Sequence, residues 1–173
     1  MIDAGDVRIV DYEPRHREAF RELNLAWIEE HFVVEEPDRR QLSDPEQSIV
    51  APGGAILVAE LRGEAIAVCA LIASSPGHFE LAKMATRKDL RGAGIGRKLI
   101  LAAVRKARSI GAHRLSLLSH HSLAPALALY RSVGFVDVPM PPGNEYARAD
   151  VAMEMVLPRV SDGGGPAVGS KNP

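Results

Sequence analysis

The stretch Arg91-Gly92-Ala93-Gly94-Ile95-Gly96 joins a predicted strand to a predicted helix. Upstream, residues 79–86 are typical of a strand, and downstream Ile95, Leu99 and Ala103 recur at helical spacing. The first N–H groups of a helix have no partner within the helix, and the helix dipole is positive at that end. Because glycine has no Cβ, a diphosphate can approach these groups closely. The stretch therefore predicts a phosphate-binding turn.

The spacing of the glycines separates this turn from two other phosphate-binding motifs. A dinucleotide-binding turn has Gly-x-Gly-x-x-Gly, and a P-loop has Gly-x-x-x-x-Gly-Lys-Ser/Thr. Here the glycines stand at every second position, and Leu99 follows Lys98 where a P-loop needs a hydroxyl. The pattern Arg-x-x-Gly-x-Gly resembles the GNAT superfamily of acyl-CoA-dependent N-acetyltransferases, and the resemblance extends over residues 7–157. It implies that the turn binds the pyrophosphate of acetyl-CoA and that the reaction needs no metal. A glycine-rich turn without a ligand is the alternative.

Composition and length indicate one globular domain. The chain has 173 residues, of which 46% are hydrophobic and 25% charged. A net charge of −1 argues against a general nucleic-acid binder. Cys69 is the only cysteine, so an intrachain disulfide is excluded, and its apolar neighbours predict that it is buried. No apolar run has membrane-spanning length and the first residues do not resemble a leader, so we expect a cytoplasmic protein without a membrane partner.

The order of expected elements is that of an α+β protein. We expect strands at residues 7–12, 55–61, 65–72, 79–86, 113–118, 135–138 and 147–157, with helices at 14–31, 95–110 and 125–133. Residues 32–54 form a long connection with a short helix after Pro45, and residues 55–72 form an antiparallel hairpin. The order β-α-β-β-β-α-β-α-β-β predicts a mixed, mostly antiparallel sheet of six or seven strands, as in the GNAT fold. The domain is expected over residues 1–158, followed by a disordered tail over residues 159–173.

A second motif resembles the same superfamily. Residues 126–135 match its pattern Ala-x-x-Leu-Tyr-x-x-x-Gly-Phe, with Tyr130 at the tyrosine position. The resemblance implies that Tyr130 is the general acid that protonates the departing thiolate. A phenol keeps its proton at neutral pH, so the chemistry is reasonable. The alternative is that Tyr130 only packs in the core.

The base that accepts a proton from the attacking amine has three candidates. Glu80 lies four residues before Met84, where several members of the superfamily place a glutamate base. Partial burial would raise its pKa toward a useful value. His120 and His121 compete with it, because imidazole titrates in the right range. Their adjacency is weak support for zinc, because no third or fourth ligand is evident.

The resemblance also implies binding residues. The cofactor-binding set comprises Met84, Ala85, Thr86, Arg91, Gly92, Ala93, Gly94, Ile95, Gly96, Arg97 and His120. Backbone groups of the first three would pair with the pantetheine arm, as an added strand would. Many relatives carry an asparagine that residues 115–130 lack; either His120, His121 or Ser122 takes its place, or the contact is missing. Extra positive charge for the phosphates is expected from Arg87, Lys88 and Lys98. The acceptor-binding set comprises Trp27, Phe32, Glu80, His121 and Tyr146.

The sequence does not identify the acceptor. A small-molecule amine and a peptide or protein amine both remain open, as do a monomer and a homodimer. Acidic residues gather at Glu29, Glu30, Glu35, Glu36 and Asp38, where they either steer a cationic amine or form an exposed helix end. A non-catalytic acyl-CoA-binding module is the alternative to an N-acetyltransferase. The presence of both Glu80 and Tyr130 favours the enzyme.

Overall fold

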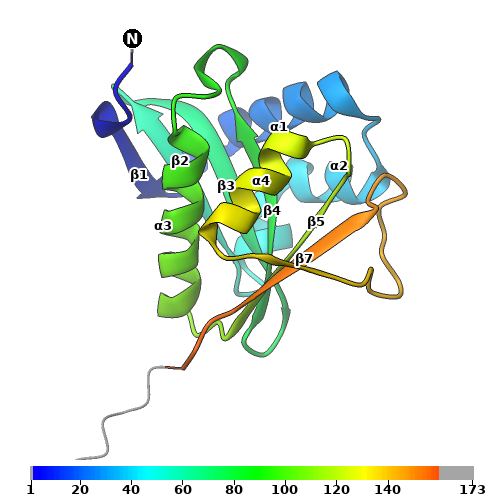
Figure 1. Cartoon of the computed structure of the whole chain (residues 1–173). Coiled ribbons are helices and arrows are strands. Elements are labelled where there is room, and N and C mark those ends of the chain that lie inside the picture. The colour runs from blue at the N-terminus through cyan, green and yellow to red at the C-terminus, as the bar shows by residue number, and fades with distance from the viewer. Residues whose placement is uncertain (1, 160–173) are drawn as a thin grey trace, which may run out of the picture.

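The fold is built on one seven-stranded sheet with helices on both faces (Figure 1). A computed structural model describes residues 2–159 of the chain. The strand order is β1-β2-β3-β4-β5-β7-β6, and every neighbouring pair is antiparallel except β4 with β5. The strands are β1 (Val7–Asp11), β2 (Ala55–Leu61), β3 (Glu64–Ser75), β4 (His78–Thr86), β5 (Arg114–Ser119), β6 (Val136–Val138) and β7 (Val151–Val156). The helices are α1 (Arg17–His31), α2 (Glu36–Ser43), α3 (Ile95–Ser109) and α4 (Ala124–Val133). The predicted fold class and the mixed, mostly antiparallel sheet are confirmed.

Helices cover both faces of the sheet. α3 and α4 lie over one face, and α1 and α2 lie over the other (Figure 1). Along β2, Leu57 and Ala59 enter the core on the α3 side, whereas Ile56 and Val58 enter the core on the α1 side. A strand buried on both faces must be apolar at successive positions, because its side chains alternate between the faces. Cys69 on β3 is 1% exposed, as its apolar surroundings predicted.

The connection between α1 and β2 contains a helix that the sequence analysis did not predict. Glu46–Val50 forms a π-helical turn, which corresponds to the short helix expected after Pro45. The additional helix is α2, whose first turn holds Pro37. A capping box starts α2, because the Asp38 carboxylate accepts a hydrogen bond of 2.9 Å from the N–H of Glu35. Proline therefore begins a helix here instead of marking a loop.

Several predicted boundaries need correction. Pro14–His16 forms a 3₁₀ turn, so α1 begins at Arg17. Residues 147–150 precede β7 and are not part of it. The predicted tail falls, apart from its first residue, outside the described residues. Within residues 2–159, no helix is both long and apolar enough to cross a membrane.

The sheet opens between its two parallel strands. β4 pairs with β5 over His78–Glu80, and no pairing with β5 continues along residues 81–86 of β4 in the described chain. β4 also carries a bulge where its register against β3 shifts, and Lys83 in this bulge has a φ of +50°. A non-glycine residue in this region is strained by about 1–2 kcal/mol and is held there by other contacts. The opening leaves the backbone of β4 free to pair with a ligand.

Candidate active site

Two cavities meet at the open edge of β4. The first, here called the inner cavity, has a volume of about 110 Å³ and lies among α1, β4 and the segment before β7. The second, called the glycine groove, has a volume of about 330 Å³ and follows the glycine turn and the starts of α3 and α4. Both cavities are lined by Trp27, Met84, Ala126 and Tyr130. At this junction, molecules held in the two cavities can touch.

The glycine turn leaves backbone N–H groups open toward the glycine groove. Gly92 and Gly94 both have a φ of +81°, which L side chains rarely adopt, and a Cβ at either position would point into open space. α3 begins at Ile95, and the N–H groups of residues 92–97 make no hydrogen bond to another part of the described chain. Unpaired N–H groups at the positive end of a 15-residue helix favour an anion.

The positive charge around the groove is smaller than the sequence suggests. Arg91 and Arg97 line the groove, where Arg91 pairs with Glu30 at 3.0 Å and Arg97 donates to Ser132 Oγ at 3.0 Å. Lys98 points away and donates to the carbonyls of Ala4 and Val7. Arg87 pairs with Glu64 and Asp89. Of the five basic residues expected near the phosphates, two are therefore held elsewhere.

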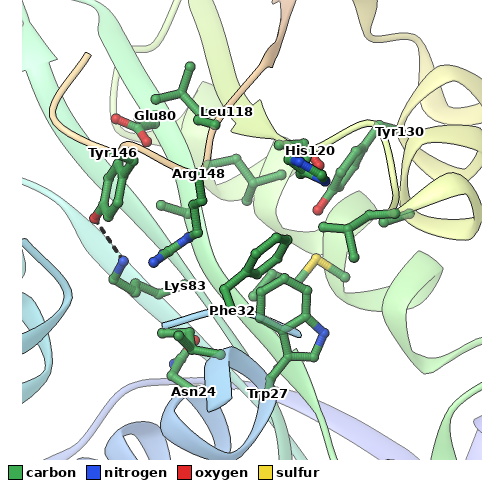
Figure 2. A pocket seen from close by; sticks show the side chains of 18 residues that line it. Asn24, Trp27, Phe32, Glu80, Lys83, Leu118, His120, Tyr130, Tyr146 and Arg148 are labelled. Carbon is green, nitrogen blue, oxygen red and sulfur yellow. Dashed lines mark hydrogen bonds between the residues drawn. The ribbon is translucent and has the colours of Figure 1, made fainter. Parts of the chain in front are cut away.

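Tyr130 extends from α4 to the junction of the cavities. Burial raises the pKa of its hydroxyl to about 12, and Cys69 adds a smaller effect in the same direction. The ring packs against Phe135 in an edge-to-face arrangement with centroids 6.1 Å apart. The hydroxyl makes no hydrogen bond within residues 2–159, and it points toward the interior of the site (Figure 2). A protonated and unpaired phenol can donate its proton to a group at the junction.

The other end of the inner cavity is closed by a buried ionic network. Lys83 Nζ lies 2.7 Å from Asp38 Oδ1 and 2.9 Å from the Tyr146 hydroxyl. Arg148 binds the same carboxylate through both terminal nitrogens, at 2.7 and 2.8 Å. Figure 2 shows Arg148 between this end, with Tyr146 and Lys83, and the end with His120 and Tyr130. Burial alone would raise the pKa of Asp38, but hydrogen bonds from Arg148 and Lys83 hold it far below its ordinary value.

This network accounts for much of the acidic cluster seen in the sequence. Glu35 pairs with Arg148 at 3.3 Å, and Asp38 is fully buried. Glu30 pairs with Arg91 and Lys88 at the groove, and Glu36 pairs with Arg39 at the surface. Four of the five acids are therefore paired within the described chain, and Glu29 and Glu36 are exposed.

Glu80 is the acidic group that remains available in the inner cavity. It lies on β4, at the same end as Tyr146 (Figure 2). Burial raises the pKa of its carboxyl, Lys83 opposes the rise, and Glu145 adds to it. The carboxylate takes part in no hydrogen bond or ion pair with the described residues. A carboxylate with a raised pKa is better able to accept a proton.

A comparison of the sequence with models of protein families shows which family the domain belongs to. Residues 16–135 match the model of the Acetyltransferase (GNAT) family. The chain belongs to this family. Curated relatives include the uncharacterized N-acetyltransferase YjgM of Escherichia coli (strain K12), 34% identical over 107 residues, and the uncharacterized N-acetyltransferase YvbK of Bacillus subtilis (strain 168), 30% identical over 97 residues. The alignments cover 60% and 54% of this chain, and 62% and 63% of those proteins. The chain thus spans less than two thirds of either relative.

Solved structures of GNAT proteins share the fold. A GNAT acetyltransferase from Staphylococcus aureus Mu50 has a TM-score of 0.79 at 18% identity, covering 88% of this chain and 99% of that one. An acetyltransferase from Streptococcus agalactiae 2603 has a TM-score of 0.75 at 20% identity, with the same coverage. At these identities the likeness establishes the architecture alone. The predicted GNAT fold is therefore confirmed.

In this GNAT domain, most residues expected at the site do line a cavity. The glycine groove contains Met84, Ala85, Thr86, Arg91, Gly92, Gly94, Ile95, Gly96 and Arg97. Ala93 lies within the same turn, and the carbonyl of Thr86 accepts a hydrogen bond from Arg91 Nε at 3.2 Å. The inner cavity contains Trp27, Phe32, Glu80 and Tyr146, all expected near the acceptor.

The two histidines lie elsewhere than expected. His120, expected at the pantetheine arm, lines the inner cavity and packs edge-to-face against Phe32 with centroids 5.3 Å apart. His121, expected to contact the acceptor, lines neither cavity; its side chain is 73% exposed and pairs with Asp150. The reason is that the chain turns after β5, so neighbouring side chains need not face the same cavity.

The sequence analysis missed the three charged residues of the buried network. Lys83 was part of a predicted strand, and Asp38 part of an acidic cluster without a fixed role. Arg148 lies in a segment that carries no motif. The capping pattern around Pro37 was a signal for Asp38, but no local signal could show that it meets Lys83 and Arg148 from distant segments.

The GNAT domain is expected to become more stable when Glu80 is replaced by glutamine. Folding raises the pKa of the Glu80 carboxyl above its ordinary value of 4.5. The protonated carboxyl therefore contributes stability to the folded state at pH values below 4.5, and this stability is lost as the pH rises through the pKa of the folded state. The midpoint of thermal unfolding of Glu80→Gln should therefore exceed that of the wild type increasingly from pH 4 to pH 8. A gain of about 1 kcal/mol corresponds to roughly 2–4 °C at this chain length.

The matched control for this prediction is Glu22→Gln, because Glu22 is exposed on α1. Its unfolding midpoint should follow that of the wild type at every pH. A difference between wild type and Glu80→Gln that stays constant over this pH range would contradict the prediction.

Proposed function

We propose that this chain transfers an acetyl group from acetyl-CoA to a primary amine by direct attack of the amine on the thioester. The observation that carries the proposal is the junction of the inner cavity and the glycine groove at Tyr130. A coenzyme bound along the groove and an acceptor bound in the inner cavity would bring their reacting atoms together there. Such positioning is a large part of catalysis in a two-substrate transfer.

Open backbone N–H groups and two arginines along the groove support its assignment to the coenzyme. The open N–H groups of residues 92–97, with Arg91 and Arg97, would hold the diphosphate. The unpaired edge of β4 over residues 81–86 would receive the amide groups of the pantetheine arm as a neighbouring strand. The thioester supplies an activated acyl group, and N–H groups of this edge would polarise its carbonyl.

Two proton transfers accompany the exchange of bonds. The neutral amine forms the new N–C bond while the C–S bond breaks, so one proton must leave the nitrogen and one must reach the sulfur. In the proposal, Glu80 takes the first proton, directly or through a water, and Tyr130 gives the second. The raised pKa of Glu80 and the unpaired, protonated hydroxyl of Tyr130 support these roles.

His120 competes with Glu80 for the role of base, since both line the inner cavity. Glu80→Gln and His120→Gln separate the two, because each replaces a proton acceptor with a neutral side chain of similar size. Loss of the true base should lower kcat by about 10²–10⁴-fold, whereas the other variant should affect KM more than kcat.

Replacing Gly94 by alanine is expected to weaken the binding of acetyl-CoA by about tenfold or more. The Cβ would strain a turn with a φ of +81° and shift N–H groups that hold the diphosphate. Loss of one hydrogen bond to a charged group, at about 1.5–3 kcal/mol, corresponds to at least this factor. Calorimetric titration with acetyl-CoA measures the change.

Gly63→Ala is the matched control for this effect on affinity. Gly63 lies in the turn between β2 and β3, with a φ of +83° and open space around its Cβ position. Both substitutions carry a similar backbone strain, so both should lower the unfolding midpoint slightly. Equal losses of acetyl-CoA affinity in the two variants would contradict the placement of the diphosphate at residue 94.

A screen of amines and short peptides with the purified protein tests the proposed activity. Thiol release from acetyl-CoA that depends on an added amine is the expected result. Binding of acetyl-CoA without thiol release over the whole panel would favour the non-catalytic acyl-CoA-binding module. Absence of acetyl-CoA binding at millimolar concentration would overturn both functions.

A further inference from the structure

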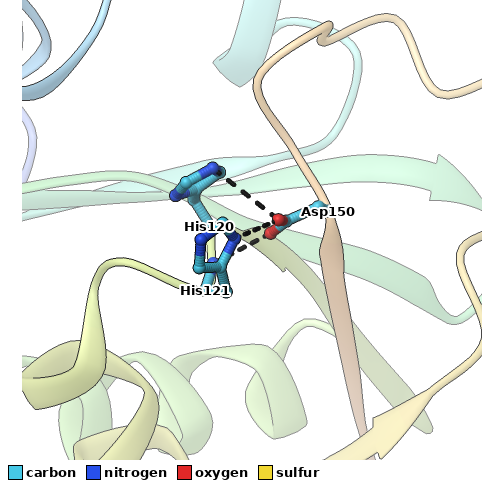
Figure 3. Close-up of side chains that lie close together, drawn as sticks. All are labelled: His120, His121 and Asp150. Atoms are coloured by element: carbon cyan, nitrogen blue, oxygen red, sulfur yellow. Dashed lines mark hydrogen bonds and ion pairs between the residues drawn. The ribbon is translucent and has the colours of Figure 1, made fainter.

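His120, His121 and Asp150 lie together, as Figure 3 shows, and His120 also lines the inner cavity. Adjacent histidines alone do not define a metal site, but the fold adds a carboxylate from a segment 29 residues away. We propose that these three side chains form a binding site for a divalent transition-metal ion, with zinc as the expected occupant. The site is separate from the groove and from the groups assigned to the transfer reaction, apart from the competing base His120.

Strand pairing brings the three residues together. His120 and His121 follow β5, and Asp150 precedes β7. Ser119 is paired with Val151 in the antiparallel ladder, and the N–H of Asp150 donates to the carbonyl of Ser119 at 3.1 Å. The position of the carboxylate opposite the histidines is therefore fixed by a regular part of the sheet.

The distance between His120 and Asp150 is close to that between two ligands of a tetrahedral zinc ion. His120 Nε2 lies 3.6 Å from Asp150 Oδ2, and the three potential ligand atoms lie within 4.8 Å of one another. Bonds of about 2.1 Å at tetrahedral angles separate ligand atoms by roughly 3.4 Å. His121 Nδ1 is in hydrogen-bond contact with the same carboxylate oxygen, which is closer than two ligands of one ion. The two side chains must therefore move apart to admit the ion.

Neighbouring groups hold the ligands in the required orientation. The N–H of His121 donates to Asp150 Oδ1 at 2.8 Å, so the second oxygen faces the two imidazoles. Ser122 Oγ lies 2.6 Å from Nδ1 of His120. The N–H of Ser122 also donates to this Nδ1 at 3.1 Å, so Nδ1 accepts in the ion-free protein and the ring proton lies on Nε2. Binding of an ion at Nε2 requires this proton to move to Nδ1, where Ser122 Oγ can accept it. In metal sites, an acceptor such as this hydroxyl generally holds the second ring nitrogen of a ligating histidine.

The ligand set selects the class of ion. Two neutral imidazoles and one carboxylate suit zinc and its transition-metal neighbours, whereas calcium and magnesium prefer oxygen ligands alone. His121 is exposed, so water has access to a fourth position. An ion bound here would also engage the ring of His120, which lines the inner cavity and packs against Phe32.

Calorimetric titration of the tag-free protein with zinc tests the site. One ion per chain is expected, with no binding of magnesium, and cobalt should give the visible absorption of a tetrahedral complex. His121→Ala and Asp150→Asn should each weaken zinc binding by at least about tenfold, and Ser122→Ala should weaken it within the 10–100-fold range of outer-shell partners. His113→Ala is the control, because His113 precedes β5 at its opposite end; it should bind zinc as the wild type does.

The titration does not depend on any transferase activity, so its outcome is independent of the proposed function. The site is overturned if the wild type shows no saturable zinc binding. It is equally overturned if His121→Ala and Asp150→Asn bind zinc as tightly as the wild type, because the ion would then lie elsewhere on the chain.

Discussion

The Tyr130→Phe variant is expected to release thiol from acetyl-CoA about 10²–10⁴ times more slowly than the wild type at saturating amine. The substitution removes one oxygen and keeps the ring that packs against Phe135. Without the phenolic proton, the thiolate must leave in its charged form or wait for a proton from water. Burial raises the pKa of Tyr130 to about 12, so in the wild type the proton is in place throughout the neutral range.

Coenzyme binding should be nearly unchanged in this variant, because the diphosphate contacts come from backbone groups of residues 92–97. Parallel measurement of kcat and of acetyl-CoA affinity separates a lost proton donor from a damaged groove. Tyr12→Phe is the matched control, since the Tyr12 hydroxyl donates to Glu46 at 2.8 Å and lines neither cavity. Wild-type turnover in Tyr130→Phe would remove Tyr130 from the mechanism.

The Asp38→Asn variant is expected to lose about 3–5 kcal/mol of unfolding free energy, the range found when one partner of a buried ion pair is removed. Asp38 is fully buried, and its carboxylate accepts hydrogen bonds from Lys83, from both terminal nitrogens of Arg148, and from the N–H of Glu35. Asparagine removes the negative charge and leaves two buried cations facing each other. Native stabilities are commonly about 5–15 kcal/mol, so denaturant unfolding would show a large shift of the midpoint.

Two further variants define the origin of this loss. Glu36→Gln, on the exposed side of the same helix, should change the unfolding free energy by less than about 0.5 kcal/mol. Adding Lys83→Met to Asp38→Asn should recover part of the loss, because it removes one of the unpaired cations. Equal unfolding free energies of Asp38→Asn and Glu36→Gln would show that the buried network does not stabilise the fold. The same conclusion would follow if Lys83→Met lowered the unfolding free energy by the same amount in the Asp38→Asn background as in the wild type.

The residues that could be assigned from the sequence act through local structure. The glycine turn and the start of α3 depend on backbone freedom and on helix ends, which neighbouring residues determine. The same holds for the hairpin of β2 and β3 and for the place of Tyr130 on α4. The missed helix α2 was also encoded locally, in the capping residues Glu35 and Asp38 around Pro37. Pro37 suggested a loop, although the first turn of a helix tolerates proline.

Tertiary structure decided which charged groups meet. Lys83, Asp38 and Arg148 come from β4, α2 and the segment before β7, and only their packing shows that they form one network. The same packing places His120 in the inner cavity and His121 outside it, and leaves the carboxylate of Glu80 unpaired in the inner cavity of the described chain.

The sequence by itself indicated the family, through two motifs that resemble it. It also indicated the order of the strands and of every long helix except α2, and a glycine turn suited to a diphosphate, because these features follow from periodicity and backbone freedom over a few residues. Only the folded chain decided that two cavities meet at Tyr130, that Lys83 and Arg148 pair with two of the clustered acids, and that Asp150 joins the two histidines. These features depend on strand register and on contacts between segments far apart in sequence, which no local pattern records.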